Sequence, residues 1–164
     1  LFTQIFQGTP LLLQLFLIFF GAPVIGMDIN PWIAAGIALI LNSGAFLGEI
    51  WRGCIQAIPR GQWEAAEALS LSYTSRMRDV VLPQAMKIAV APTVGYMVQI
   101  IKGTSLAAII GFTEITRAGQ IINNATFQPL LVFSVVASLY FVICWPLSLL
   151  ASRLERRQAR ALAR

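Results

Sequence analysis

Long uncharged runs fill most of the chain, and short polar stretches separate them. Residues 1–27, 29–48 and 118–152 contain no Asp, Glu, Lys or Arg, and residues 88–112 contain only Lys102. A helix needs about 20 mainly apolar residues to cross the hydrocarbon core of a bilayer, so each run is long enough. The pattern predicts four membrane-spanning helices, at about residues 5–26, 31–51, 88–111 and 127–150.

The overall composition supports a membrane protein. The chain has 164 residues, of which 57% are hydrophobic and only 12% are charged, whereas soluble domains usually carry about 25% charged residues. A soluble bundle would have to bury long helices on all sides, which a chain of this size cannot do. We therefore predict an all-α, polytopic membrane helix bundle, with residues 1–164 forming a single transmembrane domain.

The first residue is Leu1, and the chain opens inside an apolar run. A charged segment followed by a small-residue cleavage site, the pattern of a secretory signal peptide, does not occur there. We expect the sequence to be the C-terminal part of a longer protein, with one or more helices upstream.

The basic residues predict which side of the membrane each segment faces. Ten of the twelve Lys and Arg residues lie in or beside a central segment, residues 60–87, or in the tail, residues 153–164. Two predicted spans separate these segments, so both face the same side, and Lys and Arg mark that side as the cytoplasm. Residues 27–30 and 114–125 then face outward. For a basic tail beside membrane spans, contact with lipid is a better interpretation than binding of nucleic acid.

Several kinds of chemistry are excluded by residues that the sequence lacks. The chain contains no His, and its two cysteines, Cys54 and Cys144, lack the spacing of a metal site. A Ser-His-Asp mechanism needs His, and ATP hydrolysis through a phosphate loop needs a G-x-x-x-x-G-K-[ST] motif, which is missing. We predict a protein that is not an enzyme, has no metal site and has no cofactor of its own.

The central segment GQWEAAEALSLSYTSRMRDVVLPQA, residues 61–85, is amphipathic and rich in strong helix formers. Its pattern predicts a short helix, a turn near residues 71–74, and a second short helix up to Leu82, with Pro83 ending or bending it. The residues alone leave two interpretations open, a helix lying on the membrane surface and an element that docks onto a partner.

The same segment resembles the cytoplasmic EAA loop of ABC-transporter permeases, whose pattern is E-A-A, three residues, G, nine residues, I, any residue, L-P. The residues that match or stand for this pattern are Glu64, Ala65, Ala66, Val80, Leu82 and Pro83. Ser70 replaces the usual Gly, a residue that permits a sharp change of direction. The resemblance implies that the loop is a coupling helix for a partner ATPase, with Glu64 as the polar anchor and Ala65, Ala66 and Ser70 as the contact surface.

Three further stretches resemble the polar amino-acid permeases within that class. They are GTPLLLQ at residues 8–14, NSGAFLGEIWR at residues 42–52 and KGTSL at residues 102–106. Gln7 stands where Arg is usual, and Gly103 stands where Asp is frequent. The resemblance implies a type I importer permease fold of about five helices, with the first helix absent from this chain.

The family also implies partners and a location. A second permease subunit, identical or different, completes the pore, and separate ATPase subunits carry ATP and Mg²⁺. A periplasmic or extracellular solute-binding protein delivers the amino acid. The expected location is the bacterial cytoplasmic (inner) membrane, within the lipid bilayer.

Polar residues inside the predicted spans are candidates for the translocation path, because such residues are costly in a membrane and usually functional. Glu49 and Arg52 are three residues apart and form a pair on one helix face, which is either structural or functional. Lys102, followed by Gly103, Thr104 and Ser105, predicts a broken or re-entrant helix whose freed backbone groups face the substrate.

Asn42 and Ser43 lie in the second predicted span. They are compatible with hydrogen bonds between helices and with a role in the path. We therefore name Asn42, Ser43, Glu49, Lys102, Thr104 and Ser105 as candidate pathway residues.

Taken together, the sequence predicts the membrane-spanning permease subunit of an ATP-binding-cassette importer for polar amino acids. It forms half of an alternating-access path and performs no covalent chemistry. The alternative is a stand-alone channel or secondary carrier, and association with a phosphate-loop ATPase distinguishes the two.

Overall fold

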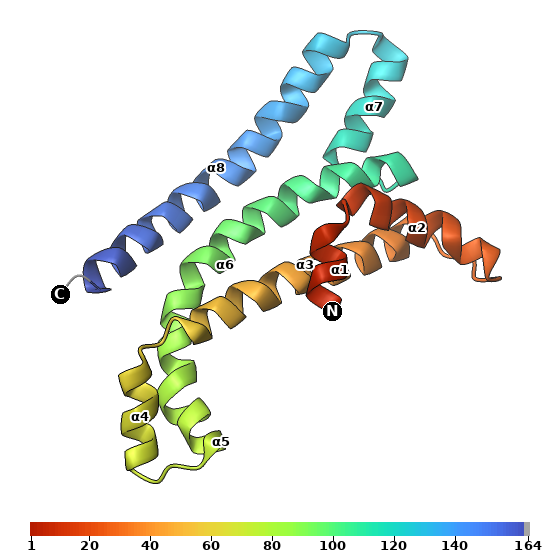
Figure 1. The fold of residues 1–164 in the computed structure, drawn as a ribbon. Coiled ribbons are helices and arrows are strands. Elements are labelled where there is room, and N and C mark those ends of the chain that lie inside the picture. The colour runs from red at the N-terminus through yellow and green to blue at the C-terminus, as the bar shows by residue number, and fades with distance from the viewer. Residues whose placement is uncertain (163–164) are drawn as a thin grey trace.

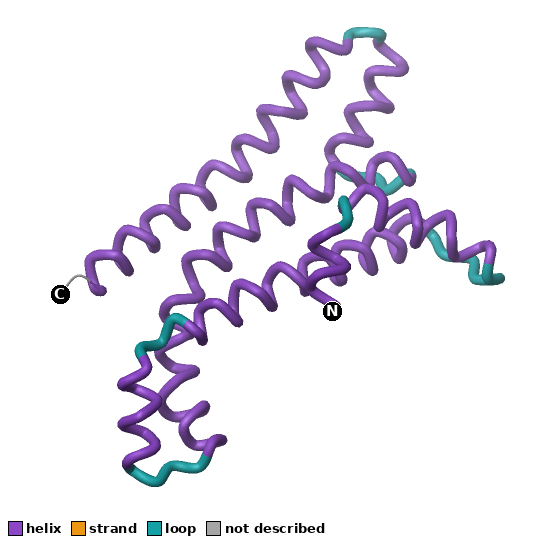
Figure 2. Tube along the Cα trace, viewed as in Figure 1, coloured by secondary structure: helices purple, strands orange, loops and turns teal. Residues whose placement is uncertain are grey.

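The computed structural model describes residues 1–162, with side chains as far as Gln158, and every regular element among them is a helix (Figure 2). The helices are α1 (Phe2–Gly8), α2 (Leu11–Val24), α3 (Pro31–Gln56), α4 (Arg60–Ala68), α5 (Tyr73–Ser75), α6 (Leu82–Thr104), α7 (Ile115–Thr126) and α8 (Pro129–Leu162). A π-helix, η1 (Arg76–Val81), precedes α6, and a 3-10 helix, η2 (Ser105–Ile110), follows it. Arg164, in the predicted basic tail, lies outside the described residues, as does the side chain of Arg160.

The long helix α6 is the centre of the arrangement (Figure 1). It packs against α3 on one side and α8 on the other, while α1 and α2 pack against α3. Two hairpins lie at opposite ends of the molecule: α4 with α5 and η1 at one end, and α7 with the first part of α8 at the other (Figure 1). The tail end of α8 lies toward the first of these ends.

Three helical stretches are long and apolar enough to cross a membrane among the described residues: Pro31–Gln56, Tyr73–Ile110 and Pro129–Gln158. The bent pair α1 and α2 makes a fourth if it counts as one span. The α3 helix starts where the sequence predicts. Asn30 caps it by accepting a hydrogen bond from the backbone N–H of Ile33 (2.9 Å), and Pro31 occupies its first turn.

The span predicted at about residues 5–26 is formed by two helices instead of one. The chain turns by 101° between α1 and α2. The cause is the Thr9-Pro10 pair: Pro10 has no N–H to donate, and a residue before proline avoids the helical region. Thr9 accordingly has extended dihedrals (φ −117°, ψ 138°).

The predicted end of a helix at Leu82 is wrong, because one continuous helix runs over the 38 residues Tyr73–Ile110. Pro83 lies in the interior of this continuous helix, where a proline normally clashes with the carbonyl group four residues before it. The preceding turns, Arg76–Val81, widen to π-helical hydrogen bonding. The helix therefore continues through Pro83 instead of stopping there.

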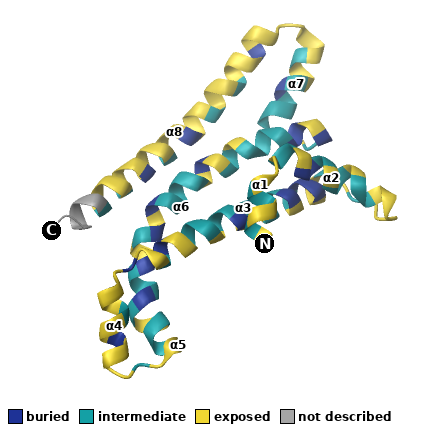
Figure 3. Ribbon diagram, in the orientation of Figure 1, coloured by how far each residue is buried: buried dark blue, intermediate teal, exposed yellow. Residues whose placement is uncertain are grey.

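The buried core is small and built largely from alanine. Its main cluster lies where α2, α3 and η2 meet, and comprises Leu15, Ala34, Ala35, Ala38, Ala107 and Ile110. Small side chains let helix backbones approach closely, which is how helices associate inside membranes. By contrast, α8 exposes most of its length (Figure 3), including Leu130, Phe141 and Val142.

Candidate functional site

The EAA hairpin, residues 60–81, is a folded unit in which α4 packs against η1. Ala66 is only 3% exposed. Two polar contacts hold α4 in place: the amide of Gln84, in the first turn of α6, donates to Gln62 Oε1 (3.1 Å), and Arg76 Nη1 of η1 pairs with Glu67 Oε2 (3.4 Å). An apolar cluster of Ile58, Val81 and Ala85, with Trp63 and Met77 against it, forms the base of the hairpin.

Ser70 forms the turn at the end of α4. Its φ is +53°, in the left-handed region. The Ser70 N–H donates to Glu67 O (2.8 Å) and the Leu71 N–H to Ala66 O (3.2 Å), which together make a Schellman motif. Glycine is the usual residue at this position of the motif, which explains the glycine of the EAA pattern in physical terms. Ser70 adopts the same backbone conformation at a cost of about 1 kcal/mol.

Of the residues predicted to contact an ATPase through α4 and its turn, some are exposed and one is buried. Glu64 and Ala65 are exposed, and so is Ser70. Ala66 is buried within the hairpin, so its assignment to the outer contact surface is wrong. Its small side chain instead allows α4 to approach η1 closely.

Leu82 and Pro83 are half-buried at the start of α6. They lie next to Val81, which is fully buried in the apolar cluster at the base of the hairpin. The L-P end of the motif therefore anchors the hairpin to the long helix and does not form its exposed tip.

Two exposed apolar residues at the tip were missed by the sequence analysis. Leu69 is 74% exposed and Tyr73 is 70% exposed, and they lie on either side of the Ser70 turn. Large apolar side chains in a turn between two polar helices were the available signal, since such positions are usually polar.

The bend in the first span contains a buried amide network. Gln14 and Asn42 are 5% and 8% exposed. The Gln14 amide donates to Phe6 O (2.9 Å) and to Thr9 Oγ1 (2.9 Å), and the Asn42 amide donates to Gln14 Oε1 (3.2 Å) and Phe6 O (3.3 Å). These bonds satisfy a carbonyl that the break between α1 and α2 leaves free.

Asn42 therefore holds the bend of α1 on α2 through hydrogen bonds between helices, one of the two interpretations that the sequence leaves open. Its sequence neighbour Ser43 is half-buried. Gln14 was not among the predicted residues. An amide in an otherwise apolar helix, five residues after a Thr-Pro break, was the signal for it.

The predicted pair of Glu49 and Arg52 forms on α3. Arg52 Nε donates to Glu49 Oε2 at 2.9 Å. The two side chains are 39% and 55% exposed, so the pair lies on the outside of this chain near the end of α3 that leads into the EAA hairpin.

The segment after Lys102 is not broken. The Thr104 hydroxyl donates to Ile101 O (2.7 Å) and the Ser105 hydroxyl to Lys102 O (2.6 Å), as α6 tightens into η2. The expectation that this segment frees backbone groups for substrate is therefore wrong. The helix ends later, at Gly111, whose φ is +86°.

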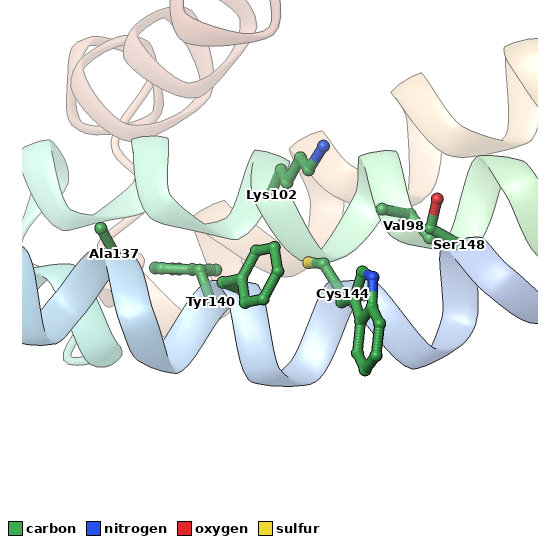
Figure 4. Close-up of a pocket in the computed structure, with 8 residues that line it drawn as sticks. Val98, Lys102, Ala137, Tyr140, Cys144 and Ser148 are labelled. Carbon is green, nitrogen blue, oxygen red and sulfur yellow. The ribbon is translucent and has the colours of Figure 1, made fainter.

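Lys102 lines a cavity of about 430 Å³ between α6 and α8, together with aromatic and small residues of α8 (Figure 4). In this view its nitrogen is directed away from α8. A second cavity, of about 280 Å³, shares Lys102, Ala137 and Tyr140 with the first and adds Ser105 and Thr116.

A polar node joins the start of α7 to the middle of α8, and the sequence analysis did not predict it. The Tyr140 hydroxyl donates to Glu114 Oε2 (2.6 Å). Glu114 also caps α7 by accepting from the backbone N–H groups of Thr116 and Arg117, both at 2.8 Å. A group of three or more His, Cys, Asp or Glu residues able to hold a metal ion does not occur in the described part of the chain.

Comparison with known proteins gives a consistent result. Residues 1–160 match the family described as binding-protein-dependent transport system inner membrane component. A probable amino-acid ABC transporter permease of Bacillus subtilis is 36% identical, over 97% of this chain and 70% of the relative. An L-cystine transport system permease of the same organism is 38% identical, over 96% and 68%. The glutamine transport system permease of Escherichia coli is 39% identical, over 95% and 72%.

Two solved structures are similar to this fold. An amino acid ABC transporter crystallised with histidines superposes with a TM-score of 0.89 at 36% identity, over 95% of this chain and 73% of the other. The methionine ABC transporter MetNI, in an inward-facing conformation, gives a TM-score of 0.76 at 20% identity, over 94% and 71%, which indicates a shared fold.

Proposed function

Because this chain belongs to the family of binding-protein-dependent transport system inner membrane components, we propose that it is the permease subunit of an ABC importer for polar amino acids. Its relatives are named as permeases for amino acids, glutamine and cystine, which supports this substrate class. The permease forms half of an alternating-access path across the bacterial cytoplasmic (inner) membrane. It carries out no covalent chemistry.

The rigid fold of the EAA hairpin supports the proposal that ATP hydrolysis drives transport. The EAA hairpin is held together by its own buried contacts and exposes Glu64, Ala65, Leu69 and Tyr73 on its outer surface. Such a folded unit transmits a force without changing its conformation, whereas an unfolded loop does not. Docked on an ATPase, it transmits the closing of the ATPase dimer to α6, with which it is continuous.

The remaining partners follow from the family and from the surface. ATP and Mg²⁺ are bound by the ATPase subunits. A second permease subunit, identical or different, completes the path and covers part of the large apolar surface that α8 exposes. A solute-binding protein delivers the amino acid on the outer side.

The test is co-purification of the complete permease with its ATPase, combined with amino-acid uptake. We expect Glu64→Lys to reduce the amount of co-purified ATPase at least about tenfold, because a charge reversal at a docking interface costs several kcal/mol. Uptake is lost while the permease stays in the membrane. The matched control is Glu155→Lys, the same substitution at an exposed position of α8, which leaves both unchanged.

Normal co-purification and uptake with Glu64→Lys would contradict a coupling role for the hairpin. Uptake by the permease in membranes without any ATPase would favour the alternative function, a stand-alone channel or secondary carrier.

A further inference from the structure

Arg76 places a positive charge inside the EAA hairpin. It begins η1, where that helix packs against α4, and its side chain is only 18% exposed. Its Nε atom is buried and has no hydrogen-bond partner among the described residues. A buried N–H group without a partner costs free energy. The structure therefore leaves one donor of this guanidinium group unused.

Glu67, in the last turn of α4, supplies the carboxylate that pairs with Arg76 within the described part of the chain. Arg76 Nη1 lies 3.4 Å from Glu67 Oε2. A charge-assisted hydrogen bond of full strength measures about 2.7–2.9 Å, and an arginine–carboxylate pair frequently contains two of them. The pair is thus long and joins a single nitrogen to a single oxygen. The Glu67 side chain is 71% exposed, so it has room to change its rotamer.

Other carboxylates do not supply the acceptor that Arg76 Nε lacks. Glu64 and Asp79, the remaining acidic residues of the hairpin, are exposed, and the ion pairs of residues 1–158 do not include them. A carboxylate of a partner protein does not reach Nε either, because this atom is buried. The acceptor has to come from within the hairpin, and Glu67 is the residue placed to provide it.

The position of this pair links it to docking. Glu67 and Arg76 lie on opposite arms of the hairpin, near the tip at which Leu69 and Tyr73 are exposed (Figure 1). The proposed docking surface lies on α4, so a bound ATPase presses this helix toward η1. A displacement of roughly 0.5 Å brings the two groups from 3.4 Å to the distance of a full charge-assisted hydrogen bond.

We propose that Arg76 is a positioning residue for the ATPase: when the ATPase docks, Nε as well as Nη1 of Arg76 donates to the Glu67 carboxylate. This inference rests on the proposed function, since it assumes that the EAA hairpin docks on an ATPase. It adds a contact within the permease that forms fully in the docked complex only. Because Arg76 belongs to the continuous helix Tyr73–Ile110, the completed pair fastens α4 directly to that helix.

The experiment compares the free permease with the complete transporter, which contains the permease, its ATPase and its solute-binding protein. Arg76→Lys keeps the charge and allows one ion pair, but it removes the planar fork that makes two parallel bonds. We expect it to weaken binding of the ATPase about fivefold, as befits a partly exposed charge pair. Protease cleavage between residues 60 and 81 of the free permease stays unchanged. The matched control is Arg78→Lys, at an exposed position of η1, which alters neither measurement.

A double-mutant cycle with Glu67→Gln shows whether the two residues act on each other. The quantity measured is again the affinity of the permease for its ATPase. We expect Arg76→Lys to change this affinity less than about twofold once Glu67→Gln is present, because the carboxylate that receives the second bond is then gone. A direct contact of Arg76 with the ATPase would instead leave the fivefold effect in place.

Three results would overturn the proposal. They are wild-type affinity of Arg76→Lys for the ATPase, a parallel loss of affinity and of protease resistance, which indicates a purely structural role, and the full effect of Arg76→Lys in the Glu67→Gln background. Failure of the proposed function is distinguishable, because the wild-type permease itself then does not bind an ATPase, whereas failure of this inference leaves wild-type binding intact.

Discussion

The two hairpins at opposite ends of the molecule are built in the same way and present opposite surfaces. In the EAA hairpin α4 packs on η1 through Ala66, and in the α7–α8 hairpin, residues 114–140, α7 packs on α8 through Gly119. Each hairpin is further fixed by polar contacts, Glu67 to Arg76 in the first and Glu114 to Tyr140 in the second. A small residue thus sets the spacing of the arms in both.

Their outer surfaces differ in what they are suited to contact. The EAA hairpin exposes charged, polar and small residues along α4, and its large exposed apolar side chains, Leu69 and Tyr73, lie at the tip. The α7–α8 hairpin exposes large apolar side chains on both arms and at the turn between them, namely Ile121, Ile122, Phe127, Leu130 and Leu131. The same local construction therefore presents a mainly polar surface at one end and large apolar side chains at the other. The two hairpins therefore differ in their surface residues and not in the way their arms pack together.

The largest effect is expected at Gly119. A Cβ at this position comes within 2.6 Å of Val136 Cγ2, so Gly119→Val forces α7 away from α8. Overpacking of this kind costs about 3 kcal/mol. The measurement is the thermal unfolding temperature of the purified permease in detergent. Gly48→Val is the control, because a Cβ at Gly48 has no atom within 4 Å, and an equal loss in both variants would contradict close packing at Gly119.

A smaller effect is expected in the other hairpin. Ala66→Leu places three extra carbon atoms in a buried contact and destabilises the EAA hairpin by about 2 kcal/mol. Ala65→Leu, at the exposed neighbouring position, leaves stability within about 0.5 kcal/mol. Protease cleavage between residues 60 and 81 measures the difference. Equal cleavage of the two variants would show that Ala66 is not the residue that sets the spacing.

The smallest change in stability is expected at two turns that have the same hydrogen-bond pattern. Gly111 and Ser70 both lie at the left-handed position of a Schellman motif. We expect Ser70→Gly to slow cleavage of the EAA hairpin, with a gain of about 1 kcal/mol, and Gly111→Ser to lower the unfolding temperature of the whole permease by a similar free energy. A change of the same sign in both variants would contradict the comparison.

The long apolar helices could be predicted from the sequence because a span leaves a run of uncharged residues. The start of α3 was predictable to the residue, since Asn30 and Pro31 form a recognisable cap. Helix α7 was not predicted. Its mixed polar and apolar residues look like a loop after a long span, and its cap uses Glu114, a less common capping residue than Asn or Ser.

The position of the candidate site along the chain was predictable, but the orientation of its individual residues was not. The E-A-A spacing located the docking hairpin, but which of two adjacent alanines faces inward depends on how α4 packs, and the motif does not encode that. Asn42 and Lys102 looked alike in the sequence as polar residues within spans. Their roles separate only through their neighbours, since Asn42 meets Gln14 across the bend and Lys102 meets an apolar cavity.

The unbroken helix Tyr73–Ile110 has a mechanical consequence. Its 38 residues give it a length of about 57 Å, from 1.5 Å per residue. It begins at Tyr73, beside the tip of the EAA hairpin, passes Lys102 and ends at Ile110, next to the turn at Gly111. For a lever of that length, a tilt of about 5° at one end displaces the other by about 5 Å, roughly the height of one helical turn. A small movement imposed on the EAA hairpin is thereby enough to displace the Gly111 turn at the other end of the helix.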